Sequence, residues 1–387
     1  MKFEFSKRLQ NLPPYLFVEI DKAKRKARAE GRDLIDLGVG DPDLPTPKHV
    51  IEKLSEAAKD PRNHRYALDQ GMPALRQAIA QWYKRRFNVV LNPETEILPL
   101  IGSKEGIAHL PLAFINPGDY VLAPNPSYPP YRGSTILSDG QVWDMPLLQE
   151  NNFLPVLEAI PRKIRSQAKL MFLNYPNNPT AALADEEFYQ KAMHFASKYN
   201  IIVAHDAAYS EMAYDGYKAL SFLELEGAKE VGVEFHSLSK TYNMTGWRIG
   251  WVCGNADIIS GISKVKSNID SGIFSAIQIA GIEALKGPQG HIQKMCAIYQ
   301  ERRNTLFEGL SSIGWKLTKP RATFYVWVAV PKGYNSQKFA DLLLKECDIV
   351  VTPGVGFGKY GQGYIRFALT VSKERISEAV KRIKKCL

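Results

Sequence analysis

The chain has 387 residues, of which 45% are hydrophobic and 23% charged, the composition of a globular protein with enough apolar material for a large core. Its net charge of +10 is spread along the chain in short amphipathic runs, which argues against a nucleic-acid-binding stripe. The four cysteines form no CxxC pair or metal-ligand cluster, the N-terminus lacks an apolar signal sequence, and no stretch approaches about 18 uninterrupted apolar residues, so we expect a cytoplasmic protein without a metal or a membrane span.

The first 47 residues contain a helical pattern at 15–30 and then the Gly/Pro-rich loop LGVGDPDLPTP. From there to about residue 285, short apolar runs alternate with amphipathic runs. The predicted strands are 96–101, 119–124, 169–174, 201–206, 234–238 and 248–254, and the predicted helices are 47–59, 72–87, 105–115, 185–199 and 275–287. Such alternation, with continuously apolar strands, predicts an α/β fold with a mostly parallel sheet covered on both faces.

The pattern changes after Pro288. A long helix is predicted at 289–312, followed by the strands 315–319, 325–331 and 364–369 and the helices 336–346 and 372–385. We interpret this region as a smaller α+β domain. The predicted organisation is therefore an N-terminal arm and part of the small domain at 1–47, a large domain at 48–287, and a small C-terminal domain at 288–387.

The segment SLSKTYNMTGWRIG, at 237–250, carries the most chemistry. Lys240 follows a predicted strand end, where ligands gather in α/β sheets, and a desolvated lysine can act as a nucleophilic amine. Ser237, Ser239 and Arg248 offer donors suited to a phosphate. The alternative is a polar loop with a solvated lysine.

Anion binding is also suggested by IGSKEG, where a predicted strand meets a helix at Ser103 and Lys104. Free N–H groups at a helix start attract anions. The segment matches neither GxxxxGK[ST] nor GxGxxG, so an ordinary strand-to-helix turn is the alternative.

Two polar side chains end or follow the strand IIVAHD. Asp206 is suited to pair with a protonated ring nitrogen, and Tyr209 to donate to a ring oxygen. A helix cap and a packed tyrosine are the alternatives. In NYPNNPT, Asn178 is a candidate donor to a ring oxygen or a carboxylate, although asparagine in such a sequence often serves only the turn.

Tyr128 in PSYPPY can stack on a planar ring or simply pack in a loop. Arg366 lies inside the apolar strand YIRFAL and therefore needs an anionic partner. That partner is either a substrate carboxylate, gripped by both guanidinium arms, or an internal Asp or Glu.

In the order GSKE, PSYPPY, PNNPT, HDAAY, SLSKTYNMTGWRIG and YIRFAL, these segments resemble the class I/II aminotransferases among the fold-type I pyridoxal-phosphate enzymes. The resemblance covers nearly the whole chain. It implies pyridoxal 5′-phosphate as cofactor and amino acids and 2-oxo acids as substrates. It also implies a large domain with a mostly parallel, seven-stranded sheet flanked by helices, beside a smaller α+β domain.

The resemblance also assigns roles to residues. Lys240 would form a Schiff base with the cofactor and move the proton at the substrate α-carbon, while Asp206 would keep the pyridine nitrogen protonated. Tyr209 and Asn178 would bind the ring hydroxyl, and Tyr128 would stack on the ring. The residues implied around the phosphate are Ser103, Lys104, Ser237, Ser239 and Arg248.

Arg366 and Asn178 would grip the substrate α-carboxylate, helped by the backbone at Gly40. Tyr66, in HRYALDQGMPALR, is similar to a tyrosine that reaches the neighbouring subunit's phosphate, which implies a homodimer with shared active sites. One departure from the family pattern is visible. Ala181 follows PNNPT where glycine is usual, and alanine tolerates fewer backbone conformations.

Within the family, segments such as PPYLFVEIDKAK and ATFYVWVAVPKGY are most similar to the group that acts on LL-2,6-diaminopimelate in lysine biosynthesis, with glutamate as amino donor. Tyr15 matches a substrate contact of that group, or else is a hydrophobic staple at a helix start. Aspartate, alanine or broad-specificity aminotransferases and a C–S β-lyase on the same fold remain alternatives. A ligand-sensing domain of a transcription regulator is disfavoured because no helix-turn-helix precedes the fold, and a nicotinamide oxidoreductase because GxGxxG is missing.

Overall fold

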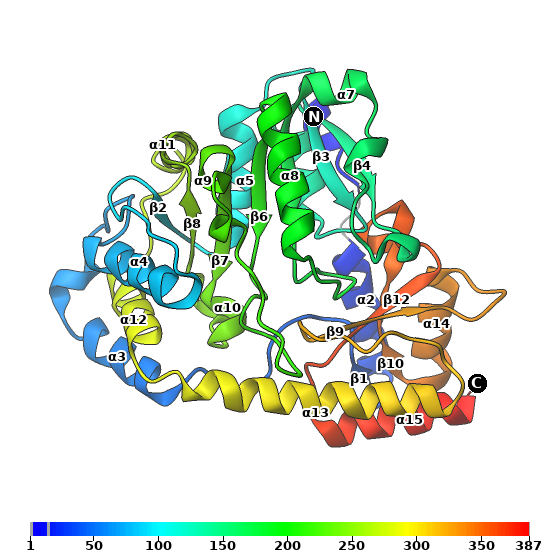
Figure 1. Ribbon diagram of the computed structural model, residues 1–387. Coiled ribbons are helices and arrows are strands. Elements are labelled where there is room, and N and C mark those ends of the chain that lie inside the picture. Colours follow the sequence, from blue (N-terminus) through cyan, green and yellow to red (C-terminus); the bar gives the residue numbers. More distant parts are fainter. Residues whose placement is uncertain (1–2, 14–15, 387) are drawn as a thin grey trace.

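A seven-stranded sheet forms the centre of the larger part of the molecule (Figure 1), in a computed structural model that describes residues 3–13 and 16–386. Across the sheet, the strands are β2 (Ile97–Leu100), β8 (Gly250–Gly254), β7 (Gly232–Ser237), β6 (Ile202–Asp206), β5 (Ala168–Leu173), β3 (Tyr120–Asn125) and β4 (Gln141–Pro146). β8 runs antiparallel to both of its neighbours, and every other adjacent pair is parallel. The predicted α/β class with a mostly parallel sheet is therefore confirmed.

Helices cover both faces because successive side chains on each strand point to opposite sides. In β5, for example, Leu170 and Phe172 belong to one apolar cluster and Met171 and Leu173 to the other. The helices contributing to the first cluster are α5 (Ser103–Phe114), α6 (Pro130–Leu137) and α11 (Ala256–Lys266), and those contributing to the second are α4 (Pro73–Phe87), α8 (Glu186–Tyr199) and α12 (Ser275–Lys286). α3 (Lys48–Ala58) packs on α12.

The smaller part of the molecule is built around a separate apolar cluster. Its antiparallel sheet contains β11 (Thr352–Pro353), β12 (Tyr364–Ala368) and β9 (Tyr325–Ala329), and beside it β1 (Ile35–Asp36) pairs in parallel with β10 (Ile349–Val350). The long helix α13 (Gly290–Ser312) runs from α12 to this region, where α14 (Ser336–Cys347) and α15 (Lys373–Cys386) complete the packing (Figure 1). The pairing of β1 with β10 agrees with placing the N-terminal segment beside the small domain, although the boundaries at 47/48 and 287/288 stay predictions.

The sequence reading differed from the structure at several elements. Residues 315–319 are not a strand, because the small sheet ends at β9 and offers them no ladder; Trp315 instead packs against Phe339 and Phe367. β4 was not predicted because it is an edge strand whose side chains are mostly half-buried, which blurs its alternation. The remaining α-helices in the described part of the chain are α1 (Lys7–Gln10), α2 (Leu16–Ala29), α7 (Arg162–Gln167), α9 (Ala228–Val231) and α10 (Leu238–Thr241).

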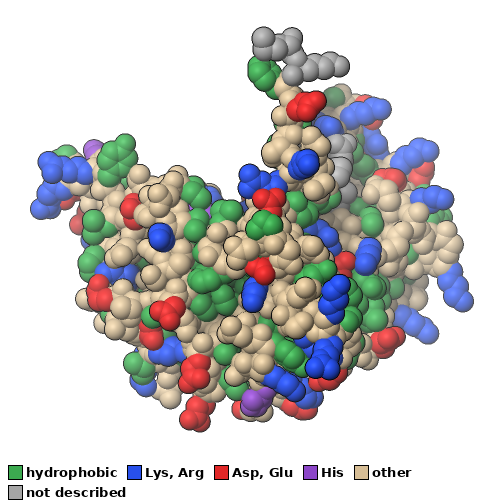
Figure 2. All heavy atoms as spheres, turned by 90° about the horizontal axis from the view of Figure 1, so that it is seen from above, with side chains coloured by type: hydrophobic (Ala, Val, Ile, Leu, Met, Phe, Trp, Pro, Cys, Tyr) green, Lys and Arg blue, Asp and Glu red, His purple; other side chains and the backbone are tan. Residues whose placement is uncertain are grey.

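Charged side chains of both signs lie on the face of the molecule drawn in Figure 2. On that face, Lys and Arg side chains are scattered among acidic ones and do not form one stripe. Within residues 3–13 and 16–386, no helix combines the length and the apolar character needed to cross a membrane.

Candidate active site

A cavity of about 570 Å³ lies at the carboxyl ends of β6 and β7 and reaches the small sheet. The loop after β1 and the helices α2, α5 and α10 also line it. It brings together twelve of the residues selected from the sequence, which are Gly40, Ser103, Lys104, Tyr128, Asn178, Asp206, Tyr209, Ser237, Ser239, Lys240, Arg248 and Arg366. Segments more than 300 residues apart in sequence therefore converge on one site.

Lys240 extends from the short helix α10, immediately after β7. Its Nζ donates a hydrogen bond to the carbonyl oxygen of Gly40 at 2.9 Å and lies 5.5 Å from the centre of the Phe324 ring. Burial lowers the pKa of the Lys240 amine to about 8, against the opposing pull of the Asp41 carboxylate. A lysine in this setting has a larger neutral, nucleophilic fraction near physiological pH than an exposed lysine.

Asp206 ends β6 and is buried beneath the cavity. Its Oδ2 accepts a hydrogen bond from the hydroxyl of Tyr131 at 2.7 Å, and its backbone carbonyl accepts one from the Asn174 amide at 2.7 Å. Burial raises the pKa of Asp206, and the hydrogen bond from Tyr131 opposes that shift. The donors that reach this carboxylate among the described residues are neutral, the Tyr131 hydroxyl and the Ala208 N–H, so it is open to a cationic nitrogen in the cavity.

Tyr131 is a residue that sequence reasoning missed. It lies in PSYPPY, three residues after Tyr128, and its ring stacks on Phe172 with the centres 4.7 Å apart. Tyr128, the residue selected from that motif, lines the cavity and meets Tyr131 edge to face at 5.7 Å. The motif therefore pointed to the right segment but to only one of its two tyrosines.

An anion cup forms where α5 begins. Gly102 precedes the helix with a φ of 75°, a conformation that suits glycine, and any side chain there would collide with the guanidinium group of Arg248. Ser237 accepts a hydrogen bond from the Ser239 N–H at 3.1 Å, which fixes the turn into α10. Lys104 and Arg248 are exposed and line the same cavity, so cations and the N-terminus of α5 surround one space.

Arg366 is 2% exposed and lies in the middle of β12. Its Nη1 donates to the Asn178 Oδ1 at 2.7 Å and its Nη2 donates to the Gly38 carbonyl at 2.8 Å, while its Nε finds no hydrogen-bond partner within residues 3–13 and 16–386. The guanidinium group lies over the ring of Tyr325, 4.1 Å from its centre. Among the described residues no Asp or Glu pairs with it, so the structure contradicts the alternative of an internal salt bridge and leaves a buried cation facing the cavity.

Tyr209 also lines the cavity. Its hydroxyl is 2.8 Å from the hydroxyl of Tyr325, and burial raises its pKa well above the usual range, so it stays a protonated donor. Tyr325 was not selected from the sequence, although it lies in the strand YVWVAVP. Its hydroxyl packs so closely against Gly40 that a side chain at that position would overlap it, which accounts for glycine there.

One selected residue, Tyr66, is not among the residues that line the cavity. Tyr66 is 92% exposed and lies in a second hollow with His64 and Phe274, away from the first cavity. Tyr15 lies outside the described residues. α2 contributes three further cavity residues that the sequence did not indicate, which are Asp21, Lys24 and Arg25.

Ala181 adopts the left-handed conformation, with a φ of 58°. Its N–H donates to the Asn177 carbonyl at 2.9 Å, and the Asn177 N–H donates to the Ala182 carbonyl at 2.9 Å. The loop thus keeps the backbone shape that glycine adopts freely, and alanine holds it at a cost.

Over nearly its whole length, the chain is similar to known aminotransferases. The family model for aminotransferase class I and II matches residues 32–383. An LL-diaminopimelate aminotransferase of Syntrophobacter fumaroxidans is 58% identical over 385 residues, covering 100% of this chain and 99% of that protein, and one of Moorella thermoacetica is 55% identical over 382 residues, covering 99% and 98%. The substrate-bound BacF structure from Bacillus subtilis superposes with a TM-score of 0.95 at 41% identity, covering 100% of this chain and 98% of that one.

The chain therefore belongs to the aminotransferase class I and II family, and its fold is that of the fold-type I enzymes. The resemblance seen in the sequence is confirmed, and the protein is an aminotransferase.

Proposed function

We propose that the protein uses pyridoxal 5′-phosphate to transfer an amino group between glutamate and LL-2,6-diaminopimelate. The observation that carries the proposal is the convergence of a buried amine, a buried carboxylate and an anion cup on one cavity, at Lys240, Asp206 and Ser103–Lys104. When bound, the cofactor supplies a pyridinium ring that withdraws electrons from the substrate α-carbon.

The residues fit this cofactor at each of its polar ends. Asp206 would supply the negative charge that the ring nitrogen needs, and the hydroxyl of Tyr131 hydrogen-bonds that carboxylate. Gly102 leaves the space in which a phosphate can approach the N-terminus of α5. The other proposed phosphate contacts are Lys104, Ser237, Ser239 and Arg248, and the proposed ring contacts are Tyr128, Asn178 and Tyr209.

Lys240 is proposed to take and return the proton at the substrate α-carbon through its Nζ. Since its pKa is lowered to about 8, the amine is neutral in a useful fraction of molecules near that pH. The nearby carbonyl of Gly40 orients the amine through the 2.9 Å hydrogen bond. Because burial raises the pKa of Tyr209, its hydroxyl stays protonated and is available as a hydrogen-bond donor.

Arg366 is proposed to bind the substrate α-carboxylate together with Asn178. The guanidinium group is already held in place by Asn178 and the Gly38 carbonyl, so little side-chain freedom is lost when a carboxylate binds. Its Nε is buried and has no hydrogen-bond partner in the described part of the chain, and a carboxylate would satisfy that donor.

The choice of LL-diaminopimelate rests on relatives that carry that name, at 52–58% identity over nearly their full length. This substrate has an amino acid group at each end. Beyond Arg366, the cavity also contains Lys24 and Arg25 of α2, whose charges suit a second carboxylate. The Nζ of Lys24 is held in place by an ion pair with Asp36 at 2.5 Å.

A homodimer is also proposed, with Tyr66 completing the partner's phosphate site. Large apolar side chains are exposed near Tyr66 at Leu68 and Phe274, and exposed apolar patches mark interaction surfaces. Ala67 and Gly272 line the same hollow as Tyr66 and Phe274, so these two segments lie together.

The substrate assignment is tested by assaying the holoenzyme with 2-oxoglutarate against LL-diaminopimelate, aspartate and alanine separately. We expect LL-diaminopimelate to give the highest kcat/KM and glutamate to accumulate. A preference for aspartate or alanine would contradict the substrate. Pyruvate and ammonia released from cystathionine, without turnover of glutamate, would instead identify a C–S β-lyase.

A further inference from the structure

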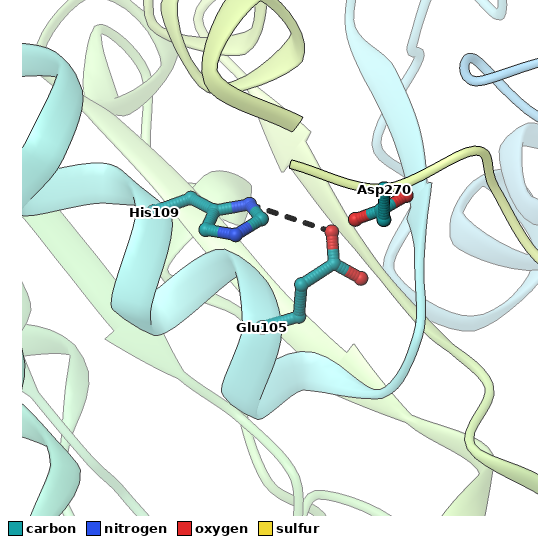
Figure 3. A group of neighbouring side chains, drawn as sticks. All are labelled: Glu105, His109 and Asp270. Carbon is teal, nitrogen blue, oxygen red and sulfur yellow. Dashed lines mark ion pairs between the residues drawn. The ribbon is translucent and has the colours of Figure 1, made fainter. Parts of the chain in front are cut away.

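A buried charge cluster lies directly behind the anion cup. Glu105 and His109 are one turn apart on α5, and both point toward Asp270, in the loop after α11 (Figure 3). The His109 Nδ1 is 3.4 Å from a Glu105 oxygen. Three potential metal ligands therefore meet in one place, with the three side chains 7–18% exposed.

The cation of this cluster is Lys266. Its Nζ lies 3.0 Å from Glu105 and 2.5 Å from Asp270, and its side chain is 1% exposed. An ammonium group thus occupies the position between the two carboxylates that a metal ion would need. We interpret the cluster as a closed ion-pair network, because a metal would have to displace a buried lysine.

One arm of this network holds the anion cup. The second oxygen of Glu105 accepts a hydrogen bond from the Ile101 N–H, the residue between β2 and Gly102. The carbonyl of Ile101 faces Arg248, whose Nη2 is 3.5 Å away. Both polar groups of this peptide segment are therefore restrained, one by Glu105 and one by a residue of the cup itself.

The other arm reaches the segment that carries Tyr66. Asp270 Oδ1 accepts a hydrogen bond from the Gly272 N–H at 2.9 Å. Gly272 has a φ of 86° and packs so tightly on the Leu68 carbonyl that an added side chain would lie 2.7 Å from it. Leu68 is two residues from Tyr66, and Gly272 lines the same hollow as that tyrosine.

We infer that Lys266 is a positioning residue that joins the cofactor's phosphate cup in its own subunit to the Tyr66 segment that serves the other subunit. The inference rests on the proposed function. Removing the ammonium group leaves the carboxylates of Glu105 and Asp270 close together without a compensating cation. The hydrogen bonds that Glu105 accepts from the Ile101 N–H and Asp270 accepts from the Gly272 N–H then weaken. Cofactor affinity then falls at two sites, in the same subunit through Glu105 and in the partner through Tyr66.

The first test compares cofactor affinity in two lysine variants. Lys266→Met is expected to raise the dissociation constant of pyridoxal phosphate by about tenfold, measured by absorbance titration of the apoprotein. Lys229→Met is the matched control, because Lys229 pairs with Glu96 at 2.8 Å at the opposite end of β2. Its affinity is expected to stay unchanged, and Lys266→Arg is expected to restore most of the lost affinity.

Asp270→Asn keeps an acceptor for the Gly272 N–H and tests the same idea if Lys266→Met fails to fold. It is expected to weaken cofactor binding several-fold. Equal affinity in Asp270→Asn and in the unaltered protein would overturn the inference. If the unaltered protein binds no pyridoxal phosphate, the proposed function itself fails.

The second test uses mixed dimers in which a single active site is intact. One subunit is unaltered, and the other carries Lys240→Ala with or without Lys266→Met. The intact site then takes its Tyr66 from the altered subunit. We expect weaker cofactor binding at that site only when Lys266→Met is present. Identical affinity in the two mixed dimers would overturn the link to the partner.

Discussion

The two walls of the cavity differ in how their charges are balanced. The wall at the ends of β6 and β7 holds an acid and a base, Asp206 and Lys240. Burial raises the pKa of Asp206 and lowers the pKa of Lys240, so it favours the neutral form of each. The wall formed by β12 presents a cation, Arg366, whose hydrogen-bond partners among the described residues are neutral groups. The first wall therefore suits a group with both positive and negative ends, and the second suits a carboxylate.

The largest effect is expected from breaking the first wall at its amine. Lys240→Ala removes the group proposed both to hold the cofactor covalently and to move the α-carbon proton, so transamination should fall by more than about 10⁴-fold. Single-turnover kinetics with glutamate measure this loss. Lys104→Ala serves as a control, since it should weaken cofactor retention and still allow turnover at saturating cofactor. Near-normal turnover in Lys240→Ala would contradict the role.

The second wall should respond mainly in substrate binding. Arg366→Ala removes charge-assisted hydrogen bonds that contribute about 1.5–3 kcal/mol, so the KM for glutamate should rise roughly 10- to 100-fold. Arg366→Lys keeps the positive charge but loses the two parallel N–H donors of the guanidinium group. Its KM for glutamate should therefore lie between those of the unaltered protein and Arg366→Ala. Steady-state kinetics separate KM from kcat. An unchanged KM in Arg366→Ala would show that the carboxylate binds elsewhere.

The difference between the walls also predicts a pH profile. Because the pKa of Lys240 is lowered to about 8, its amine becomes neutral well below the usual range for lysine. The rate at which apoprotein takes up pyridoxal phosphate should therefore rise about tenfold per pH unit as pH increases toward 8, and level off above it. Stopped-flow absorbance follows the uptake. A rate still rising steeply at pH 10 would mean that the amine is not perturbed.

The sequence predicted some residues of the cavity better than others. Asp206 and Lys240 follow apolar strand ends in chain order, and parallel strands bring such ends to one edge, so local pattern was enough. Tyr325 and Tyr131 could not be selected in this way, because only the packing of distant strands makes them partners of Tyr209 and Asp206.

The failure at residues 315–319 has a similar cause. That segment alternates as a strand should, but a strand also needs a neighbour, and only the topology shows that β9 is the sheet edge. The cluster around Lys266 was equally invisible, because Glu105 and Lys266 are 161 residues apart and each looks like an ordinary helix charge.

The smallest expected effect is a change in stability at Ala181, in the loop after β5. Ala181 holds a left-handed conformation that costs an L-residue about 1–2 kcal/mol, while glycine loses up to about 1 kcal/mol of chain entropy. Ala181→Gly should therefore stabilise the protein by roughly 0.5 kcal/mol and leave kcat/KM unchanged. Urea unfolding measures the gain. Clear destabilisation would indicate that the methyl group, which is 7% exposed with its residue, contributes packing that outweighs the strain.

The central claim is that the cavity around Lys240 binds pyridoxal phosphate and passes an amino group through it. The most direct measurement is the visible absorbance of the purified protein, recorded with added pyridoxal phosphate, then with glutamate, and then with 2-oxoglutarate. We predict a yellow protein whose absorbance band shifts with glutamate and returns with 2-oxoglutarate, and a Lys240→Ala variant that does not complete this cycle. A colourless protein whose spectrum is unaffected by added cofactor and glutamate would contradict the account.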